Sequence, residues 1–170
     1  MVLSPMLAPP SAPANLTAIP TNLQINLNWN PVNGATNYTL KRGTANGGPY
    51  PTICRGLTAT NYADANVTNT VTYYYVVTAL GAGGESSNSV QAAAAPLPSK
   101  QPTSISASLS SGRLALSWPF DHIGWRLQAQ TNGLNPANWV EVPGATATNL
   151  ISIEVDPANW SVFYRMVYSP

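Results

Sequence analysis

The chain has 170 residues, of which 44% are hydrophobic and only 8% charged, and its net charge is +1. This length accommodates one domain or two small ones, and the charged fraction is far below the ~25% usual for globular proteins. The few scattered basic residues exclude a cationic track for nucleic acid, and no apolar run approaches the ~20 residues of a membrane helix. We therefore expect no nucleic-acid partner and no membrane insertion.

Residues 1–12 are rich in proline and predict an extended lead-in. They lack the basic region and the long apolar core of a secretory signal, so we expect a mature or trimmed fragment. The single cysteine, Cys54, forms no internal disulfide and has no Cys/His set for zinc. Burial as a small apolar residue fits Cys54 better than the alternative of a reactive thiol.

Short strands with turn residues between them follow in the first half. Residues 23–29 alternate strictly, with Leu23, Ile25, Leu27 and Trp29 on one face, as in a half-buried strand. The Tyr-rich stretch 72–80 predicts a central strand that a Gly-rich turn joins to its partner. The expected strands are 15–19 (ended by Pro20), 23–29, 38–42, 50–55, 58–62, 72–80 and 86–94. Seven such strands predict an immunoglobulin-like β-sandwich.

These residues resemble a fibronectin type III domain over residues 13–95. The resemblance rests on the proline-led first strand, Trp29, Tyr38, the Thr72-to-Ala79 stretch and the Gly84-Glu-Ser86 turn. It implies that Trp29 and Tyr38 pack between the sheets. It also implies that Tyr73 is the corner tyrosine, whose hydroxyl bonds to nearby backbone.

A proline-rich linker, residues 96–102, leads to a second region with the same pattern. Leu116-Ser-Trp118 repeats Leu27-Asn-Trp29, and about six strands predict a smaller β-sandwich over residues 103–170. The predicted fold is therefore all-β, with two tandem immunoglobulin-like sandwiches. The strings around Trp125, Trp139 and Arg165 resemble a C-terminal β-module of secreted planctomycete and verrucomicrobial exoproteins. We expect glycine in that pattern where this chain has Trp160.

The sequence contains no convincing catalytic constellation. Asp121 and His122 resemble a general-base pair, but no Ser or Cys nucleophile lies in a strained turn, so a hydrogen-bonding role in a loop is favoured. The six acidic residues are isolated, which disfavours glycoside hydrolysis. Glu154 and Asp156 share a strand face, and solvated charges explain them better than a weak calcium site. We therefore expect no enzyme activity, no metal site and no cofactor.

Aromatic residues are the one positive functional signal. Trp29, Trp118 and Trp125 are expected in the cores, which leaves other aromatics to stack on sugar rings beside amide side chains. The candidate carbohydrate-binding residues are Trp139, Trp160, Tyr74, Gln130 and Asn138. For each aromatic, partial burial is the alternative.

The sequence thus predicts a non-catalytic accessory region of a secreted bacterial protein, at the cell surface or outside the cell. Its expected partners are a polysaccharide or cell-wall polymer and attached catalytic or surface domains. The alternative is a structural spacer, adhesin or extracellular filament subunit that acts through protein–protein contacts, including self-association.

Overall fold

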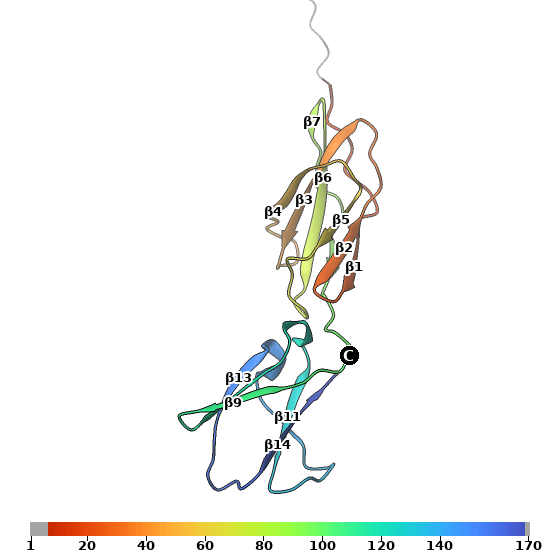
Figure 1. Ribbon diagram of the computed structural model, residues 1–170. Helices are drawn as coiled ribbons and strands as arrows, with labels where there is room; N and C mark the ends of the chain where they lie inside the picture. Colours follow the sequence, from red (N-terminus) through yellow and green to blue (C-terminus); the bar gives the residue numbers. More distant parts are fainter. Residues whose placement is uncertain (1–6, 169–170) are drawn as a thin grey trace, which may run out of the picture. The chain divides into compact units, whose positions relative to one another are not determined.

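The protein, seen here as a computed structural model, divides into two compact units, residues 1–96 (unit 1) and 97–170 (unit 2). The structure describes residues 7–168, so half of the predicted lead-in, residues 1–6, lies outside the described residues. Strands dominate both units, and the described helical segments are two short 3₁₀ turns, Phe120–His122 and Ala145–Ala147. Within the described residues, no helix is long and apolar enough to span a membrane. The all-β prediction is confirmed (Figure 1).

Unit 1 is a sandwich of two antiparallel sheets, as predicted. The first sheet has the order β1 (Thr17–Thr21), β2 (Gln24–Asn28) and β5 (Asn61–Asp64). The second has the order β4 (Thr52–Leu57), β3 (Ala35–Gly43), β6 (Tyr73–Gly81) and β7 (Gly84–Glu85), with β8 (Ala92–Ala94) also paired to β6.

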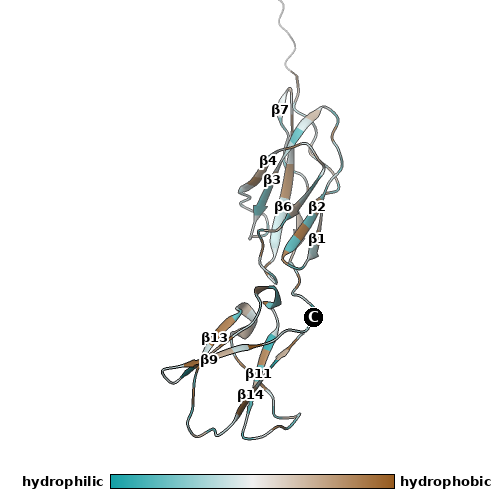
Figure 2. Ribbon diagram, viewed as in Figure 1, coloured by the Kyte–Doolittle hydropathy of each residue, from teal (hydrophilic) through white to brown (hydrophobic). Residues whose placement is uncertain are grey.

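The alternation of the sequence places the core of unit 1 between these sheets. Hydrophobic and hydrophilic bands alternate along β2 (Figure 2), and Ile25 and Leu27 are fully buried. Trp29 packs edge-to-face on Tyr38 with ring centroids 5.6 Å apart. The Tyr73 hydroxyl accepts a hydrogen bond from the Thr68 backbone N–H at 3.1 Å, which confirms the corner tyrosine.

Two strand ends in unit 1 differ from the prediction. β1 continues through Pro20 to Thr21, because β1 is an edge strand and its outer side needs no N–H donor. The second strand begins at Gln24, because Leu23 has φ +53° and belongs to a two-residue turn. The Leu23 N–H donates instead to the Asn69 side chain at 3.0 Å.

The predicted strand 86–94 is also interrupted. Within it only β8 is regular strand, β7 ends just before it, and between these two strands serine hydroxyls replace carbonyl groups as partners of β6. Ser86 Oγ accepts the Ala79 N–H at 2.9 Å, and Ser89 Oγ accepts the Val77 N–H at 3.1 Å. The sheet edge is therefore covered along most of β6 by a mixture of main-chain and side-chain bonds.

Unit 2 is a smaller sandwich of two three-stranded antiparallel sheets. One has the order β13 (Leu150–Glu154), β10 (Arg113–Ser117) and β9 (Ser106–Ser110). The other has the order β12 (Val140–Glu141), β11 (Arg126–Thr131) and β14 (Val162–Val167).

The core of unit 2 is built on Leu116, Trp118, Leu127 and Ala145. The segment that we expected to be a linker bonds to this unit: Ser99 N–H donates to the Asp121 carbonyl, and Trp125 Nε1 donates to the Ser99 carbonyl, both at 2.8 Å. These bonds fix residues 99–101 beside the 3₁₀ turn that follows Trp118.

The outer edge of β14 pairs with none of the described residues. Asn132 N–H donates to the Ser161 carbonyl, and in an antiparallel ladder every second residue bonds to the same neighbour. Phe163, Arg165 and Val167 therefore bond to β11, and the N–H and C=O groups of Val162, Tyr164 and Met166 point to the free edge. The matching edge of β6 in unit 1 is the one that β7 and β8 cover.

Candidate functional site

Trp160 is the most exposed large aromatic side chain among the described residues. It lies in the loop between β13 and β14, and 85% of its surface is open to solvent. Burying a Trp side chain is strongly favourable, so one that stays exposed beside polar groups marks a surface suited to a ligand.

Carboxylate and amide groups surround Trp160. The Asp156 carboxylate accepts hydrogen bonds from the Ala158 N–H at 2.9 Å and from Asn159 Nδ2 at 3.1 Å. Asn132 Nδ2 reaches Asn159 Oδ1 at 3.4 Å, which ties the loop after β11 to the loop before β14. These bonds fix Asp156 and Asn159, which line the same cavity as Trp160.

Trp139 is half-buried, and a cation covers one of its faces. Arg165 Cζ lies 4.2 Å from the centre of the Trp139 ring, and Arg165 Nε donates to Gln128 Oε1 at 2.9 Å. A ligand would have the other face of the ring or would have to displace the guanidinium. Asn138 is exposed next to it, with its N–H bonded to the Asn135 carbonyl.

Gln130 does not lie on the surface, since only 4% of it is exposed. Its Oε1 accepts the Asn135 N–H at 3.0 Å, and its Nε2 has no partner among the described residues. The side chain therefore anchors the loop that carries Asn138 and Trp139. Nothing in the sequence distinguishes such an amide from an exposed one, because Gln130 lies on the outward face of an alternating strand.

Tyr74 belongs to unit 1, where it is half-buried and pairs with Ala93 of β8. The five residues predicted from the sequence are thus divided between the two units. Within unit 2, the structure places Trp139, Asn138 and Gln130 around one loop and Trp160 on another.

Asp121 and His122 form the structural unit that the sequence favoured. His122 is buried; its Nδ1 lies 2.6 Å from Asp121 Oδ1, and its Nε2 lies 2.8 Å from the Gln101 carbonyl. Both ring nitrogens thus have partners, Nδ1 in the Asp121 carboxylate and Nε2 in the Gln101 carbonyl. Among residues 7–168, no cluster of three or more His, Cys, Asp or Glu side chains has the arrangement of a metal site.

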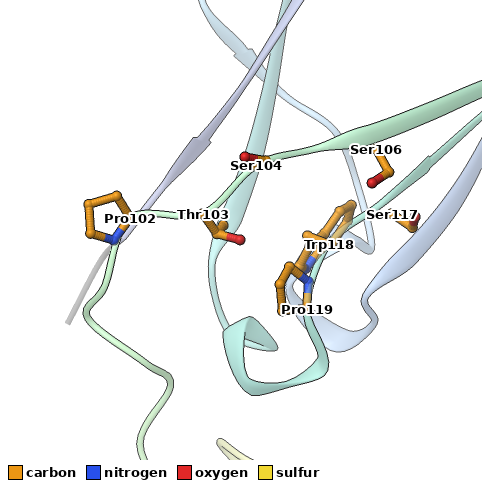
Figure 3. Close-up of a pocket in the computed structure, with 7 residues that line it drawn as sticks. All are labelled: Pro102, Thr103, Ser104, Ser106, Ser117, Trp118 and Pro119. Carbon is orange, nitrogen blue, oxygen red and sulfur yellow. The ribbon is translucent and has the colours of Figure 1, made fainter.

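A shallow pocket of about 610 Å³ lies where the chain enters β9 (Figure 3). Hydroxyl groups of Thr103, Ser104, Ser106 and Ser117 line it beside Trp118. The Trp118 indole N–H has no partner among the described residues, and the matching Trp29 of unit 1 shares this property. The unpartnered indole is therefore a feature of the packing in both units and does not mark a ligand.

The structure adds a cavity that the sequence did not predict. It has a volume of about 430 Å³ and lies between the two sheets of unit 2, with Trp160, Asp156 and Asn159 among its lining residues. The sequence signal for this cavity is that polar residues of unit 1 are replaced by apolar residues at the equivalent positions of unit 2. These positions can be aligned only from the strand pairing.

No family model matches the chain. About half of it is similar to amylopullulanases: 36% identity over 91 residues with that of Thermoanaerobacterium saccharolyticum and 38% over 91 residues with that of Thermoanaerobacterium thermosulfurigenes. The match covers 53% of this chain in both cases, but only 7% and 5% of those proteins.

Among solved structures, an Fn3-like protein from Clostridium thermocellum is 39% identical and covers 55% of this chain and 98% of its own, with a TM-score of 0.48. A β-1,2-glucanase from Parabacteroides distasonis is 25% identical and covers 56% of this chain and 14% of its own, with a TM-score of 0.47.

Proposed function

We propose that this chain is a non-catalytic accessory region of a secreted bacterial carbohydrate-active enzyme, and that unit 2 binds polysaccharide at Trp160. The similarity of about half the chain to a small part of amylopullulanases supports the attachment to such an enzyme.

The observation that carries the proposal is the exposed Trp160 indole, which lines a cavity together with the hydrogen-bonded Asp156 and Asn159. The C–H-rich face of a pyranose ring packs well on an aromatic surface, while its hydroxyl groups need hydrogen-bond partners. The Asp156 carboxylate and the Asn159 amide supply such partners. Stacking orients the sugar, and the carboxylate and amide select its hydroxyl pattern.

Binding by stacking and hydrogen bonds is weak at each site and needs no metal. Its effect is to raise the local concentration of substrate around an attached catalytic domain, because a second binding event on a linked chain becomes intramolecular. The similarity to amylopullulanases makes an α-glucan such as starch the first polymer to test. Trp139 and Asn138 form a second, weaker candidate contact, since Arg165 already covers one face of Trp139.

One observation favours the alternative of a structural or adhesive role. The free edge of β14 and the exposed side chains of β9 are surfaces that pair with other strands in assemblies. Under this alternative the chain would associate with itself or with another protein and would not bind glycans.

A pull-down of the full chain on insoluble starch, cellulose, xylan, chitin and peptidoglycan separates the two. We expect retention on one polymer that Trp160→Ala abolishes and Trp139→Ala reduces. Leu134→Ala is the matched control, since Leu134 is also an exposed apolar residue of unit 2 in a loop. Failure of the parent chain to bind any polymer would overturn the proposal and favour the assembly role.

A further inference from the structure

The cavity of unit 2 lies between the two sheets at one end of the sandwich. Its walls are apolar side chains from both sheets, and a tyrosine ring completes them: Leu109, Leu114, Ala129, Ile153, Val162 and Tyr164. Trp160 and the polar residues Thr131, Asp156, Asn159 and Ser161 also line it, together with Glu154, which alternates with the core-facing Ile153 in β13. Volumes of ~300–1,000 Å³ with apolar walls and few polar groups are typical of small-molecule sites.

The strand pairing shows which residues hold the same place in unit 1. Arg42 pairs with Tyr75 in unit 1, and Ala129 pairs with Tyr164 in unit 2. In the other sheet, Ile25 pairs with Asp64 in unit 1, and Leu114 pairs with Ile153 in unit 2. Tyr73 lies two residues before Tyr75 in β6, and Val162 lies two residues before Tyr164 in β14, so Tyr73 and Val162 also hold the same place.

In unit 1 this place is filled by a polar network. Asp64 is 3% exposed; its Oδ2 accepts hydrogen bonds from Arg42 Nη1 at 2.7 Å and from the Tyr75 hydroxyl at 2.9 Å. The Arg42 guanidinium also lies over the Tyr73 ring, 5.0 Å from its centre. The long side chains of Arg42 and Tyr73 cover this end of the sandwich.

In unit 2 each filling group except one is replaced by a smaller or apolar residue. Arg42 becomes Ala129, Asp64 becomes Ile153 and Tyr73 becomes Val162, while Tyr164 keeps the place of Tyr75. Burial raises the pKa of Tyr164, consistent with an apolar setting. The same strand register therefore leaves an open apolar space in unit 2 at the place where unit 1 has the Arg42–Asp64–Tyr75 network.

We infer that this cavity binds the apolar body, aromatic or branched aliphatic, of a small molecule whose hydrogen-bond donor group faces the Asp156 carboxylate at the rim. The apolar walls favour a group that loses no hydrogen bonds on entry. The Asp156 carboxylate disfavours an anion in the same position. Trp160 lies at the rim and packs against the part of the ligand that stays outside.

A sugar ring does not suit the interior of the cavity. A pyranose carries hydroxyl groups on its rim, and burial of a hydroxyl group without a partner costs about 1–3 kcal/mol. The lining offers hydroxyl partners at Thr131, Ser161 and Tyr164, too few for a ring that carries a hydroxyl group on most of its carbon atoms. The inference therefore goes beyond the polysaccharide proposal, which concerns the outer face of Trp160.

Titration of the full chain with N-phenyl-1-naphthylamine tests the inference, since this neutral amine becomes fluorescent on leaving water. We expect saturable binding to the parent chain and at least tenfold weaker binding of 8-anilinonaphthalene-1-sulfonate, whose sulfonate meets the Asp156 carboxylate. Ala129→Phe should fill the cavity and weaken binding of the neutral dye at least tenfold. Arg42 shows that this backbone position in the fold accepts a large side chain.

A second variant tests the inference even if Ala129→Phe does not fold. Ala129→Arg with Ile153→Asp transfers the unit 1 network to unit 2 and should also abolish dye binding, with an unchanged circular dichroism spectrum. Unchanged dye affinity in a folded Ala129→Phe chain would overturn the inference, as would an equal affinity for the sulfonate dye. Retention of Ala129→Phe on the polysaccharide, together with loss for Trp160→Ala, would separate this cavity from the proposed glycan surface.

Discussion

In unit 1, Arg42, Asp64 and Tyr75 meet between the sheets, whereas Ala129, Ile153 and Tyr164 occupy the same register in unit 2. Both solutions leave the strand pairing intact, so pairing alone does not determine how the end of a sandwich is closed. A buried charged network requires every member, because a lone charge in the interior is costly. Apolar replacements remove that requirement and leave space.

The hydrophobic cores and the sheet edges also show that unit 2 is less closed than unit 1. Unit 1 buries ten residues in one core cluster, whereas unit 2 buries four. The edge of β6 is covered, and that of β14 is free. The two units therefore combine one framework with two degrees of closure, and unit 2 is the more open of the two.

The largest expected effect is the loss of the unit 1 network. Asp64→Asn should lower the free energy of unfolding of unit 1 by about 3 kcal/mol, because it leaves Arg42 without its buried partner. The matched change in unit 2, Ile153→Val, should cost about 1 kcal/mol. Urea titration followed by the NMR amide peaks of each unit measures both. Equal costs in the two units would contradict the contrast.

The second largest expected effect is a difference between the two units in their loss of stability at alkaline pH. Burial and the neighbouring Asp64 carboxylate raise the pKa of Tyr75, while burial alone raises that of Tyr164. A raised pKa means that stability is complete below the pKa of the unfolded chain, 10.0, and is lost above it.

The loss should be about 1.4 kcal/mol per pH unit for one tyrosine, and it should continue over a wider pH range in unit 1. The same urea titration repeated from neutral to alkaline pH measures it. Tyr164→Phe is the control that should remove the loss in unit 2 only.

A smaller effect concerns the two hairpin turns. Leu23 of unit 1 and Gly112 of unit 2 both have positive φ, +53° and +74°, directly before the second strand of each hairpin. Gly112→Leu should destabilise unit 2 by about 1–2 kcal/mol, because a residue with a Cβ is strained at this positive φ. A steric clash does not contribute, because no atom lies within 4 Å of the added Cβ. Ser110→Ala on the preceding strand should change stability by less than about 0.5 kcal/mol. Thermal unfolding is the readout.

The smallest effect is at Glu85. The Thr78 hydroxyl and Lys41 Nζ both donate to Glu85 Oε1, at 2.6 Å and 2.9 Å, and lower the pKa of the carboxyl group. The stabilisation should be present above the pKa of the unfolded chain and be lost as the pH falls through the lower folded value. Glu85→Gln should therefore cost unit 1 less than about 1 kcal/mol at neutral pH and nothing in acid. An equal cost at both pH values would exclude this ion pair as the cause.

Alternation and turn residues predicted the fold well. Ile25, Leu27 and Trp29 face the core as expected, because a strand that covers one core face imposes a period of two. The serine hydroxyls that interrupt strand 86–94 were not predictable, since their partners in β6 depend on the fit between two strands. The same holds for the Arg42–Asp64–Tyr75 network, whose members come from three strands.

The candidate site was predictable only in part. An exposed Trp160 follows from its position in an Asn- and Pro-containing loop, but the burial of Gln130 depends on how the loop after β11 folds back. The cavity behind Trp160 requires knowing that Ala129 and Ile153 face each other across the sandwich. Such long-range placement is not encoded in local periodicity.

The free edge of β14 has a consequence for hydrogen exchange. Amide protons that lie in a hydrogen-bonded ladder exchange with solvent deuterons only when the structure opens, whereas those at an open edge need no opening. Val162, Tyr164 and Met166 should take up deuterium quickly while Phe163, Arg165 and Val167 between them stay protected. Along β6 the amides of Val77 and Ala79 have serine partners and should exchange slowly. Fast and slow amides that alternate along one strand would thus report the open side of unit 2, and uniform slowing would report its occupation.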